Sequence, residues 1–178
     1  MVFMGRELFY TTFKTPAGWV GLAASPEGLY RVILPQPTQV ITKTMLLENL
    51  KDTAPSSEIF ADITKRLLAY FSGKPAAFPD TLDYADATPF QRRIWEAARK
   101  IPYGKTNTYS WVAAQAGNPK AVRAAGQALG QNPFPIIVPC HRVTYTGGGL
   151  GGFSAPGGTA TKEYLLKLEN NGASKRPR

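Results

Sequence analysis

The chain contains a single cysteine, Cys140, and a single histidine, His141, and the two are adjacent. One cysteine excludes an internal disulfide. One cysteine and one histidine are too few for a structural zinc site, which takes four ligands, and no carboxylates stand at a spacing that would complete such a site. We therefore expect the protein to need neither a metal ion nor another cofactor.

Long apolar runs are absent as well. No segment approaches the roughly 18 consecutive apolar residues of a membrane span. Near the start, Arg6, Glu7 and Lys14 stand where a secretory signal would have an apolar core. These absences argue against a membrane protein and against export. We expect a soluble protein of the cytoplasm, or of the nucleus if the source is eukaryotic.

Acidic residues are scarce in the second half of the chain. Residues 84–178 hold thirteen lysines and arginines against four acidic residues, whereas residues 1–83 hold eight of each, so the net charge of +9 arises in the second half. Such an excess indicates a polyanionic partner, nucleic acid before membrane because no strongly amphipathic basic helix is evident. Charge alone also fits a basic surface that only keeps the protein in solution.

The first half has the pattern of a small α/β unit. The sequence Ser-Pro-Glu-Gly at 25–28 predicts a turn that pairs residues 19–24 with residues 29–34 as a hairpin. A helix is expected to open at Ser57 and to end before Gly73, because apolar residues between them follow helical spacing. The proline-containing segment 73–87 is interpreted as a linker between domains.

The second half begins with helix signals. Thr88 is a predicted N-cap, followed by a proline at the first helical position and a glutamine at the third. A second helix is expected from about Tyr109 to Ala116 with Thr108 as its cap, and a third over residues 119–130. Two helices joined by a tight turn make a helix-turn-helix candidate.

The third predicted helix consists almost entirely of alanine, glycine and valine, with Arg123 and Gln127 as a polar pair four residues apart. Alanine-rich helices usually pack in a core. A core helix has little use for Arg123, however. In a basic half-chain, the helix fits close approach to a DNA groove with one arginine reaching in.

The remaining signal is the stretch PCHRV at 139–143, which follows a predicted strand at 136–138. A free cysteine is most often a small buried apolar residue. A thiol that acts as a nucleophile needs a base or positive neighbours, because few thiols ionise at neutral pH. His141 and Arg142 supply both types. Glu169, on a final amphipathic helix, is the carboxylate best suited by type to orient the imidazole.

These residues resemble the O6-alkylguanine-DNA alkyltransferases, also called methylated-DNA–protein-cysteine methyltransferases. The resemblance rests on PCHRV, preceded by Asn132-Pro133 and followed by a GGF segment, and it extends over residues 84–170. Residues 1–83 match the family's N-terminal domain only in general pattern. The stretches that carry the resemblance are TPFQRRIWEAARKIPYGKT, Tyr109, GNPKAVRAAGQALGQNPFPIIVPCHRV and KEYLLKLE.

The resemblance implies an α+β fold with two domains. Residues 1–83, with the linker, would form a small RNase H-like α/β domain. Residues 84–170 would form a mainly helical, winged-helix-like domain with a helix-turn-helix, and residues 171–178 a flexible basic tail. The implied partner is double-stranded DNA containing O6-alkylguanine, bound through its minor groove by a monomer.

The resemblance also implies a role for each site residue. Cys140 attacks the alkyl carbon on O6 of guanine and keeps the group as a thioether, so each molecule acts once. His141 accepts the thiol proton through a water, Glu169 orients His141, and Asn132 holds the active-site turn. Tyr109 promotes rotation of the nucleotide and protonates the leaving guanine, and Arg123 fills the gap in the base stack. The other implied contacts are DNA binding by Tyr109, Ala121, Ala124, Gly126 and Gln127, and a guanine pocket formed by Val143, Ser154 and Leu129.

Two features depart from the family pattern. Ala155-Pro156 stand where the family commonly runs from serine directly to Gly-Gly, which bears on the pocket contacts and on the size of alkyl group tolerated. The N-terminal cysteines and histidines of the family's zinc-binding members are missing, so we expect no need for zinc.

Three other functions fit parts of the sequence. Alkyltransferase-like proteins bind alkylated DNA without repairing it, but another residue replaces their cysteine. A thiol hydrolase would use Cys140 and His141, yet no oxyanion hole is evident and the Arg123 helix has no part in it. A plain helix-turn-helix regulator leaves PCHRV unexplained. The mass of the protein after exposure to alkylated DNA separates these functions, because only transfer leaves the alkyl group on the protein.

Overall fold

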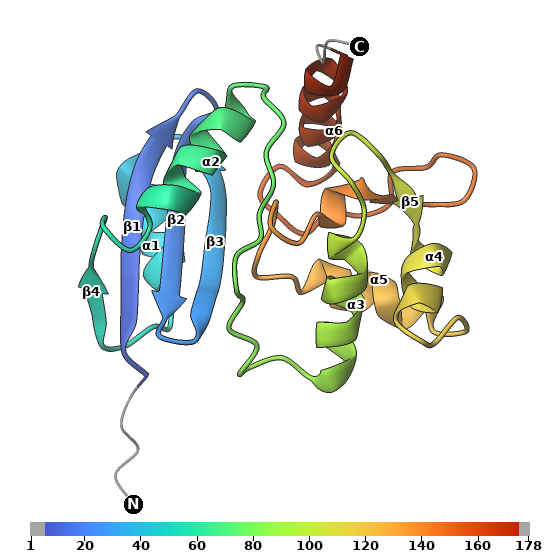
Figure 1. The fold of residues 1–178 in the computed structure, drawn as a ribbon, viewed down its shortest axis with the longest axis horizontal. Coiled ribbons are helices and arrows are strands. Elements are labelled where there is room, and N and C mark those ends of the chain that lie inside the picture. Colours follow the sequence, from blue (N-terminus) through green and yellow to red (C-terminus); the bar gives the residue numbers. More distant parts are fainter. Residues whose placement is uncertain (1–5, 175–178) are drawn as a thin grey trace, which may run out of the picture. The chain divides into compact units, whose positions relative to one another are not determined.

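The computed structural model describes residues 6–174, and the chain divides into two compact units. One unit comprises Met1–Ser72 and Ala76–Tyr84, and the other comprises Gly73–Pro75 and Ala85–Arg178. The fold is mixed α/β, with a small sheet in the first unit and mainly helices in the second (Figure 1).

The first unit is built on a four-stranded sheet in the order β3-β2-β1-β4. β1, β2 and β3 run antiparallel, and β4 lies parallel to β1. The predicted hairpin is confirmed, since Ser25 pairs with Gly28 across the turn. The strands are β1 (Leu8–Thr15), β2 (Gly18–Ser25), β3 (Gly28–Gln36) and β4 (Thr53–Pro55).

Two helices cover this sheet: α2 (Ala61–Phe71) lies in front of it in Figure 1 and α1 (Gln39–Leu47) lies behind it. The sequence patterns predict neither α1 nor β4. The predicted start of α2 at Ser57 is wrong, because the chain first turns, with the Ala61 amide donating to the Glu58 carbonyl at 3.1 Å. Ile59 lies in this turn and is 54% exposed, so it is not part of the buried helical face.

The segment 73–87 is not the linker that its composition predicts, because most of it packs on the first unit. Leu82 is buried and forms a β-bridge with Leu29. The Leu29 amide donates to the Thr81 carbonyl at 2.9 Å, and the Asp83 amide donates to the Leu29 carbonyl at 2.8 Å. The segment therefore adds strand-like pairing to β3, which proline content alone does not reveal.

The second unit is mainly helical. α3, α4 and α5 contact one another, and the Trp95 indole on α3 donates to the Ala128 carbonyl on α5 at 2.8 Å. Two short strands, β5 and β6, pair in parallel in this unit. The elements are α3 (Pro89–Arg99), β5 (Asn107–Thr108), α4 (Tyr109–Gln115), α5 (Val122–Gly130), β6 (Val143–Thr144) and α6 (Gly158–Ser174).

Two helices of this unit start at the predicted caps. The Gln91 amide donates to the Thr88 hydroxyl at 3.1 Å, and the Gln91 side chain accepts from the Thr88 amide at 2.8 Å, which completes a capping box. Thr108 caps α4 by accepting from the Trp111 amide at 3.1 Å. The third helix begins at Val122, three residues later than predicted, because the chain turns at residues 119 and 120.

Residues 136–138 form a turn, so the predicted strand is wrong. The Val138 amide donates to the Phe134 carbonyl at 2.8 Å, and Ile136 adopts a φ of 73°. A positive φ is costly for a β-branched residue and persists only where the surroundings impose it. Ile136 is 1% exposed, so core packing holds this conformation.

The last helix is longer than the sequence predicts. α6 continues to Ser174, so residues 171–174 are helical where we expected a flexible tail. The rest of that predicted tail, residues 175–178, lies outside the described residues. Over residues 6–174, no helix combines the length and apolar character needed to cross a membrane.

Replacing Thr88 with alanine should lower the free energy of unfolding by about 1 kcal/mol, because the Gln91 amide loses its side-chain acceptor. Thr88→Ser is the matched control, since a serine hydroxyl accepts the same bond and should keep nearly wild-type stability. Urea denaturation measures both variants. Equal unfolding free energies for Thr88→Ala and Thr88→Ser would mean that the cap does not stabilise α3.

Candidate active site

A pocket of about 730 Å³ opens in the second unit, and this volume falls in the ~300–1,000 Å³ range of small-ligand sites. Its walls come from α4, α5, the 3₁₀ turn Cys140–Arg142 and the loops on either side of Gly149. The pocket brings predicted catalytic, DNA-binding and guanine-pocket residues together. The lining residues are Tyr109, Val122, Arg123, Gly126, Gln127, Leu129, Gly130, Cys140, Tyr145, Gly152, Phe153 and Ser154.

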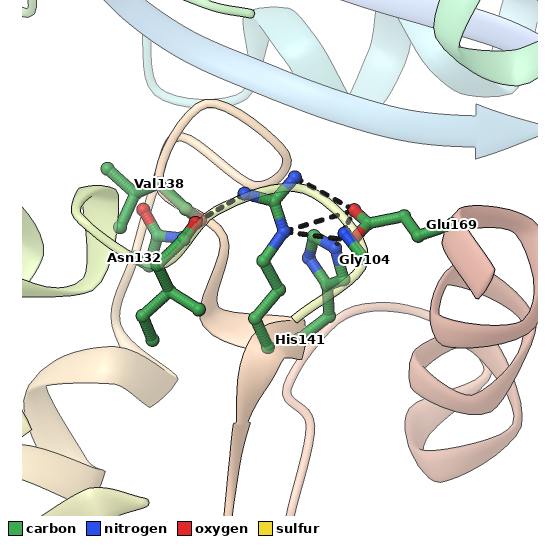
Figure 2. Close-up of polar contacts among 7 residues, drawn as sticks. Gly104, Asn132, Val138, His141 and Glu169 are labelled. Atoms are coloured by element: carbon green, nitrogen blue, oxygen red, sulfur yellow. Dashed lines mark hydrogen bonds and ion pairs between the residues drawn. The ribbon is translucent and has the colours of Figure 1, made fainter. Parts of the chain in front are cut away.

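Asn132 fixes the turn that carries the thiol. Its Nδ2 donates to the Val138 carbonyl at 2.9 Å and to Cys140 Sγ at 3.3 Å, and its Oδ1 accepts from the Phe134 amide at 2.9 Å. Figure 2 shows Asn132 and Val138 side by side. One side chain therefore ties two backbone positions of the turn to the sulfur.

Cys140 is partly exposed, and its side chain opens on the pocket. Burial raises the pKa of the Cys140 thiol, while the hydrogen bond from Asn132 and the charge of Lys162 lower it by less. The thiol is therefore protonated at neutral pH. To act as a nucleophile it has to pass its proton to a base during the attack.

His141 follows Cys140 directly in the chain and is the candidate base for the thiol. Its side chain is fully buried, and Nε2 lies 2.6 Å from Glu169 Oε1 (Figure 2). Burial lowers the pKa of His141, and the contact with Glu169 opposes this shift without reversing it. The imidazole is therefore neutral at neutral pH. When Nε2–H donates to the carboxylate, Nδ1 is the ring nitrogen that accepts a proton.

Glu169 lies at the centre of a buried polar network. It accepts from Arg142 Nε at 2.9 Å, from Arg142 Nη2 at 3.0 Å and from the Gly104 amide at 3.1 Å, and it is 1% exposed. Burial raises the pKa of this carboxyl, but the hydrogen bond with His141 and the bonds and charge of Arg142 outweigh burial and lower the pKa to about 2. Arg142 Nη1 also donates to the Ile101 carbonyl at 2.7 Å. The carboxylate stays ionised and its orientation is fixed.

Lys162 is a site residue that the sequence reasoning misses. Its buried ammonium donates to the Val143 carbonyl at 2.6 Å and to the Tyr109 hydroxyl at 3.4 Å. Burial lowers the pKa of Lys162 to about 8. Its charge lowers the pKa of the Cys140 thiol. The sequence reasoning assigned this effect to Arg142, which instead binds the network at Glu169.

Helical spacing is the signal that could have found Lys162. It precedes Leu165 by three residues and Glu169 by seven, so all three side chains lie on one face of α6. Leu165 and Glu169 are each 1% exposed. A lysine in register with a buried face needs a buried acceptor, and the Val143 carbonyl is that acceptor.

Tyr109 opens α4, and its ring packs against the small-residue helix α5. A Cβ built on Gly126 would lie 3.7 Å from the ring, which is ordinary contact, so a longer side chain at this position would displace the tyrosine. Burial raises the pKa of the Tyr109 hydroxyl, with smaller contributions from Tyr145 and Cys140. The phenol is therefore a proton donor at neutral pH. Arg123, on α5, is exposed and lines the same pocket.

Of the predicted DNA-binding and guanine-pocket residues, three lie outside the pocket lining of the described chain: Ala121, Ala124 and Val143. Val143 is fully buried and contributes its carbonyl to Lys162. Ser154 lines the pocket, and its hydroxyl donates to the Gly130 carbonyl at 2.6 Å. Among residues 6–174, no group of three or more His, Cys, Asp or Glu side chains could hold a metal ion.

The arrangement is suited to displacement by sulfur. The site combines a protonated thiol and a protonated phenol, which line one pocket, with a neutral imidazole that contacts an ionised carboxylate. The imidazole, oriented by the carboxylate, can accept the proton of the thiol, and the phenol can give a proton to a leaving group.

Comparison with known proteins agrees with this chemistry. Residues 89–171 match the family model described as 6-O-methylguanine DNA methyltransferase, DNA binding domain. A methylated-DNA–protein-cysteine methyltransferase of Methanosarcina acetivorans is 39% identical over 165 residues, which are 92% of this chain and 99% of the relative. The constitutive enzyme of that name from Bacillus subtilis is 37% identical over 161 residues, covering 90% of this chain and 94% of the relative.

Solved structures give the same answer. The crystal structure of Mycobacterium tuberculosis O6-methylguanine methyltransferase superposes with a TM-score of 0.74 at 36% identity, covering 96% of this chain and 95% of the other. A structure of the M. tuberculosis protein in complex with DNA also gives a TM-score of 0.74, at 37% identity over 91% of this chain and 92% of the other. The chain therefore belongs to the methylated-DNA–protein-cysteine methyltransferase family.

Proposed function

We propose that this protein repairs DNA by moving the alkyl group from O6 of a guanine to Cys140, once per molecule. The observation that carries the proposal is the shared pocket: the sulfur opens on the same cavity as Arg123, the exposed cation of a helix made of small residues. Relatives named for methyl transfer to a protein cysteine support the reaction. A related protein crystallised with DNA supports the partner.

The transfer is a displacement at the alkyl carbon. Cys140 Sγ bonds to the carbon as the bond from carbon to O6 breaks, and the thiol proton passes to His141. Tyr109 gives its hydroxyl proton to the departing guanine, which leaves as a neutral base. Lys162, 3.4 Å from the Tyr109 oxygen, stabilises the phenolate. Tyr109 and His141 return to their starting protonation states when the phenolate takes a proton from solvent and His141 releases one.

Glu169 and Asn132 are positioning residues in this scheme. Because the pKa of the thiol is raised, the attack depends on His141 holding Nδ1 ready for the proton. Glu169 maintains that tautomer through Nε2, and Asn132 holds the sulfur in place at 3.3 Å. The thioether that forms is not activated for a second displacement, so the protein is consumed by the reaction.

A guanine in a duplex has to rotate out of the base stack before its O6 substituent can reach the sulfur. We propose that α4 and α5 are the helix-turn-helix of a winged-helix-like domain and that α5 enters the minor groove. Ala121, Ala124 and Gly126 would permit the close approach, with Gln127 beside them. Arg123 would occupy the gap in the stack while Tyr109 promotes the rotation.

The finer parts of the proposal concern the pocket and the first unit. Leu129 and Ser154 would contact the flipped guanine, because both line the cavity beside Cys140. Val143 would act through its backbone, since its carbonyl holds Lys162. We further propose that the first unit is RNase H-like and that the protein acts as a monomer in the cytoplasm.

Binding of damaged DNA without transfer is the main alternative function. A binder needs the groove and the flipping residues, but it has no use for a thiol with a base and a buried carboxylate behind it. The bond from Asn132 to the sulfur and the bond between His141 and Glu169 are therefore the features that favour transfer.

Incubation with a duplex containing one O6-methylguanine should raise the protein mass by about 14 Da, one methyl in place of hydrogen, on Cys140. Intact-mass spectrometry with peptide mapping measures the gain and its position. The Cys140→Ala variant should gain no mass and should still bind the duplex. A gain in that variant, or wild-type protein that binds without gaining mass, would contradict the assignment of Cys140 as acceptor.

Replacing Arg123 with alanine should slow repair of a duplex by about tenfold or more, because unstacking a base costs a few kcal/mol. Reaction with the free base O6-methylguanine should change little, since no flipping is needed. Lys120→Ala is the control, because it removes an exposed cation near the start of the same helix but outside the pocket. Equal losses on duplex and free base would remove Arg123 from flipping.

Replacing Glu169 with glutamine should slow methyl transfer by about 10²-fold or more, since His141 loses the acceptor that fixes its tautomer. The pKa of Glu169 falls from 4.5 to about 2 on folding, so the group stabilises the fold fully above pH 4.5 and loses this effect as the pH falls toward 2. This linkage amounts to ~3 kcal/mol. The variant should lack this component in thermal unfolding between pH 5 and about 2.

Glu163→Gln is the matched control for that experiment. Glu163 lies on the same helix but forms an exposed ion pair with Lys167 at 3.1 Å, so its loss should alter neither transfer nor acid stability. Transfer by both variants is measured at a temperature where circular dichroism shows them folded. A Glu169→Gln variant that is folded and transfers at the wild-type rate would exclude the positioning role.

A further inference from the structure

Tyr103 is a half-buried aromatic residue of the second unit that the mechanism above does not use. It lies in the turn after α3, which the Lys105 amide closes by donating to the Pro102 carbonyl at 3.1 Å. The Arg142 guanidinium lies over its ring, with Cζ 5.8 Å from the ring centroid. The negative face of an aromatic ring attracts a cation, and more strongly where water is excluded. Tyr103 therefore contacts the cation that binds Glu169.

The same turn contacts the buried ion pair at two further points. The Ile101 carbonyl accepts from Arg142 Nη1 at 2.7 Å, and the Gly104 amide donates to Glu169 at 3.1 Å. Figure 2 shows Gly104 beside the Glu169 carboxylate. Residues 101–104 therefore supply a bond to the cation, a bond to the anion and a ring over the cation.

Small residues at the end of α6 make room for this turn. Gly172 is buried, and a Cβ built on it would clash with the Tyr103 hydroxyl and lie 2.6 Å from the Gly73 carbonyl oxygen. Gly104 has a φ of 70°, which favours glycine, and a Cβ built there would lie 2.9 Å from the Ala173 Cβ. This close packing leaves the Tyr103 ring little freedom to move away from the guanidinium.

A fixed guanidinium fixes the carboxylate that it binds. Arg142 donates to both oxygens of Glu169, from Nε to Oε2 at 2.9 Å and from Nη2 to Oε1 at 3.0 Å, and such a two-bond pair is held in one plane. Oε1 is also the oxygen that lies 2.6 Å from His141 Nε2. The orientation of the guanidinium therefore sets the direction from which the carboxylate meets the imidazole. A rotated carboxylate would hold Nε2–H less well and would let the proton move to Nδ1.

We propose that Tyr103 is a positioning residue for the transfer. Its ring holds the plane of the Arg142 guanidinium and keeps water from its face. Through Arg142 and Glu169, the ring maintains the Nε2–H tautomer of His141. Tyr103 is not among the pocket-lining residues of the described chain, so it acts through Arg142 and not on the substrate. The proposal rests on the proposed function, because the tautomer matters for transfer only if His141 takes the thiol proton.

The test observes the imidazole directly. His141 is the only histidine, so ¹⁵N-labelled protein made without a histidine tag gives one pair of imidazole nitrogen signals in a long-range ¹H–¹⁵N correlation spectrum. In wild-type protein the two signals should be well separated, since one nitrogen carries the proton. Tyr103→Leu should move them toward each other as the tautomers mix. The same variant should slow methyl transfer from the free base O6-methylguanine by about three- to tenfold, the contribution of one cation–π contact.

Three further variants complete the test. Tyr103→Phe keeps the ring and should restore both the signals and the rate. Tyr30→Leu is the matched control, because the Tyr30 ring also lies against an arginine, 5.9 Å from Arg31 Cζ, but in the first unit. It should leave both measurements unchanged. If Tyr103→Leu does not fold, Tyr103→Met replaces it with the same expectation, since methionine fills more of the space without offering a ring face.

Unchanged imidazole signals in a folded Tyr103→Leu variant would overturn the proposal even if transfer were slower, because the ring would then only support the fold. An equally large effect in Tyr103→Phe would assign the role to the hydroxyl and would overturn it as well. Failure of the proposed function is distinct, because wild-type protein would then gain no mass from alkylated DNA, while the imidazole signals of the variants could still be compared.

Discussion

The buried carboxylate of Glu169 is the interaction on which the rest of the site depends. Through His141 and Arg142 it joins α6 to the turn that carries the thiol, and through the Gly104 amide it joins α6 to the chain after α3. A buried charge is stable only when its partners are all in place. Folding of the second unit and assembly of the proton acceptor are therefore one event. The same bonds that hold α6 against the turn keep the imidazole in its working tautomer.

Much of the fold could be predicted from sequence where the signals are local. The capping box at Thr88, the cap at Thr108 and the hairpin around residues 25–28 each involve neighbours in the chain. The errors occur where specific side-chain bonds override the apolar pattern. Residues 136–138 read as an apolar strand, but the bonds of Asn132 to Phe134 and Val138 bend them into a turn.

The candidate site divides in the same way. Cys140, His141 and Glu169 were identified by residue type and by the family resemblance, and the structure brings the last two into contact. The partners of Arg142 and Lys162 could not be predicted from sequence. Arg142 is two residues from Cys140 and Lys162 is 22 residues away, so the sequence favours Arg142 as the cation that lowers the pKa of the thiol. In the folded protein the two cations have the opposite roles. Arg142 is bound by Glu169, and the charge of Lys162 lowers the pKa of the Cys140 thiol.

The position of α6 at the end of the described chain has a consequence for synthesis. Cys140 is translated before both Lys162 and Glu169, which arrive together on the last helix. A nascent chain that has reached only the thiol has no carboxylate to hold His141 and no ammonium beside the phenol. The proton acceptor for the thiol is therefore completed only once α6 has been synthesised and has packed against the turn that carries His141.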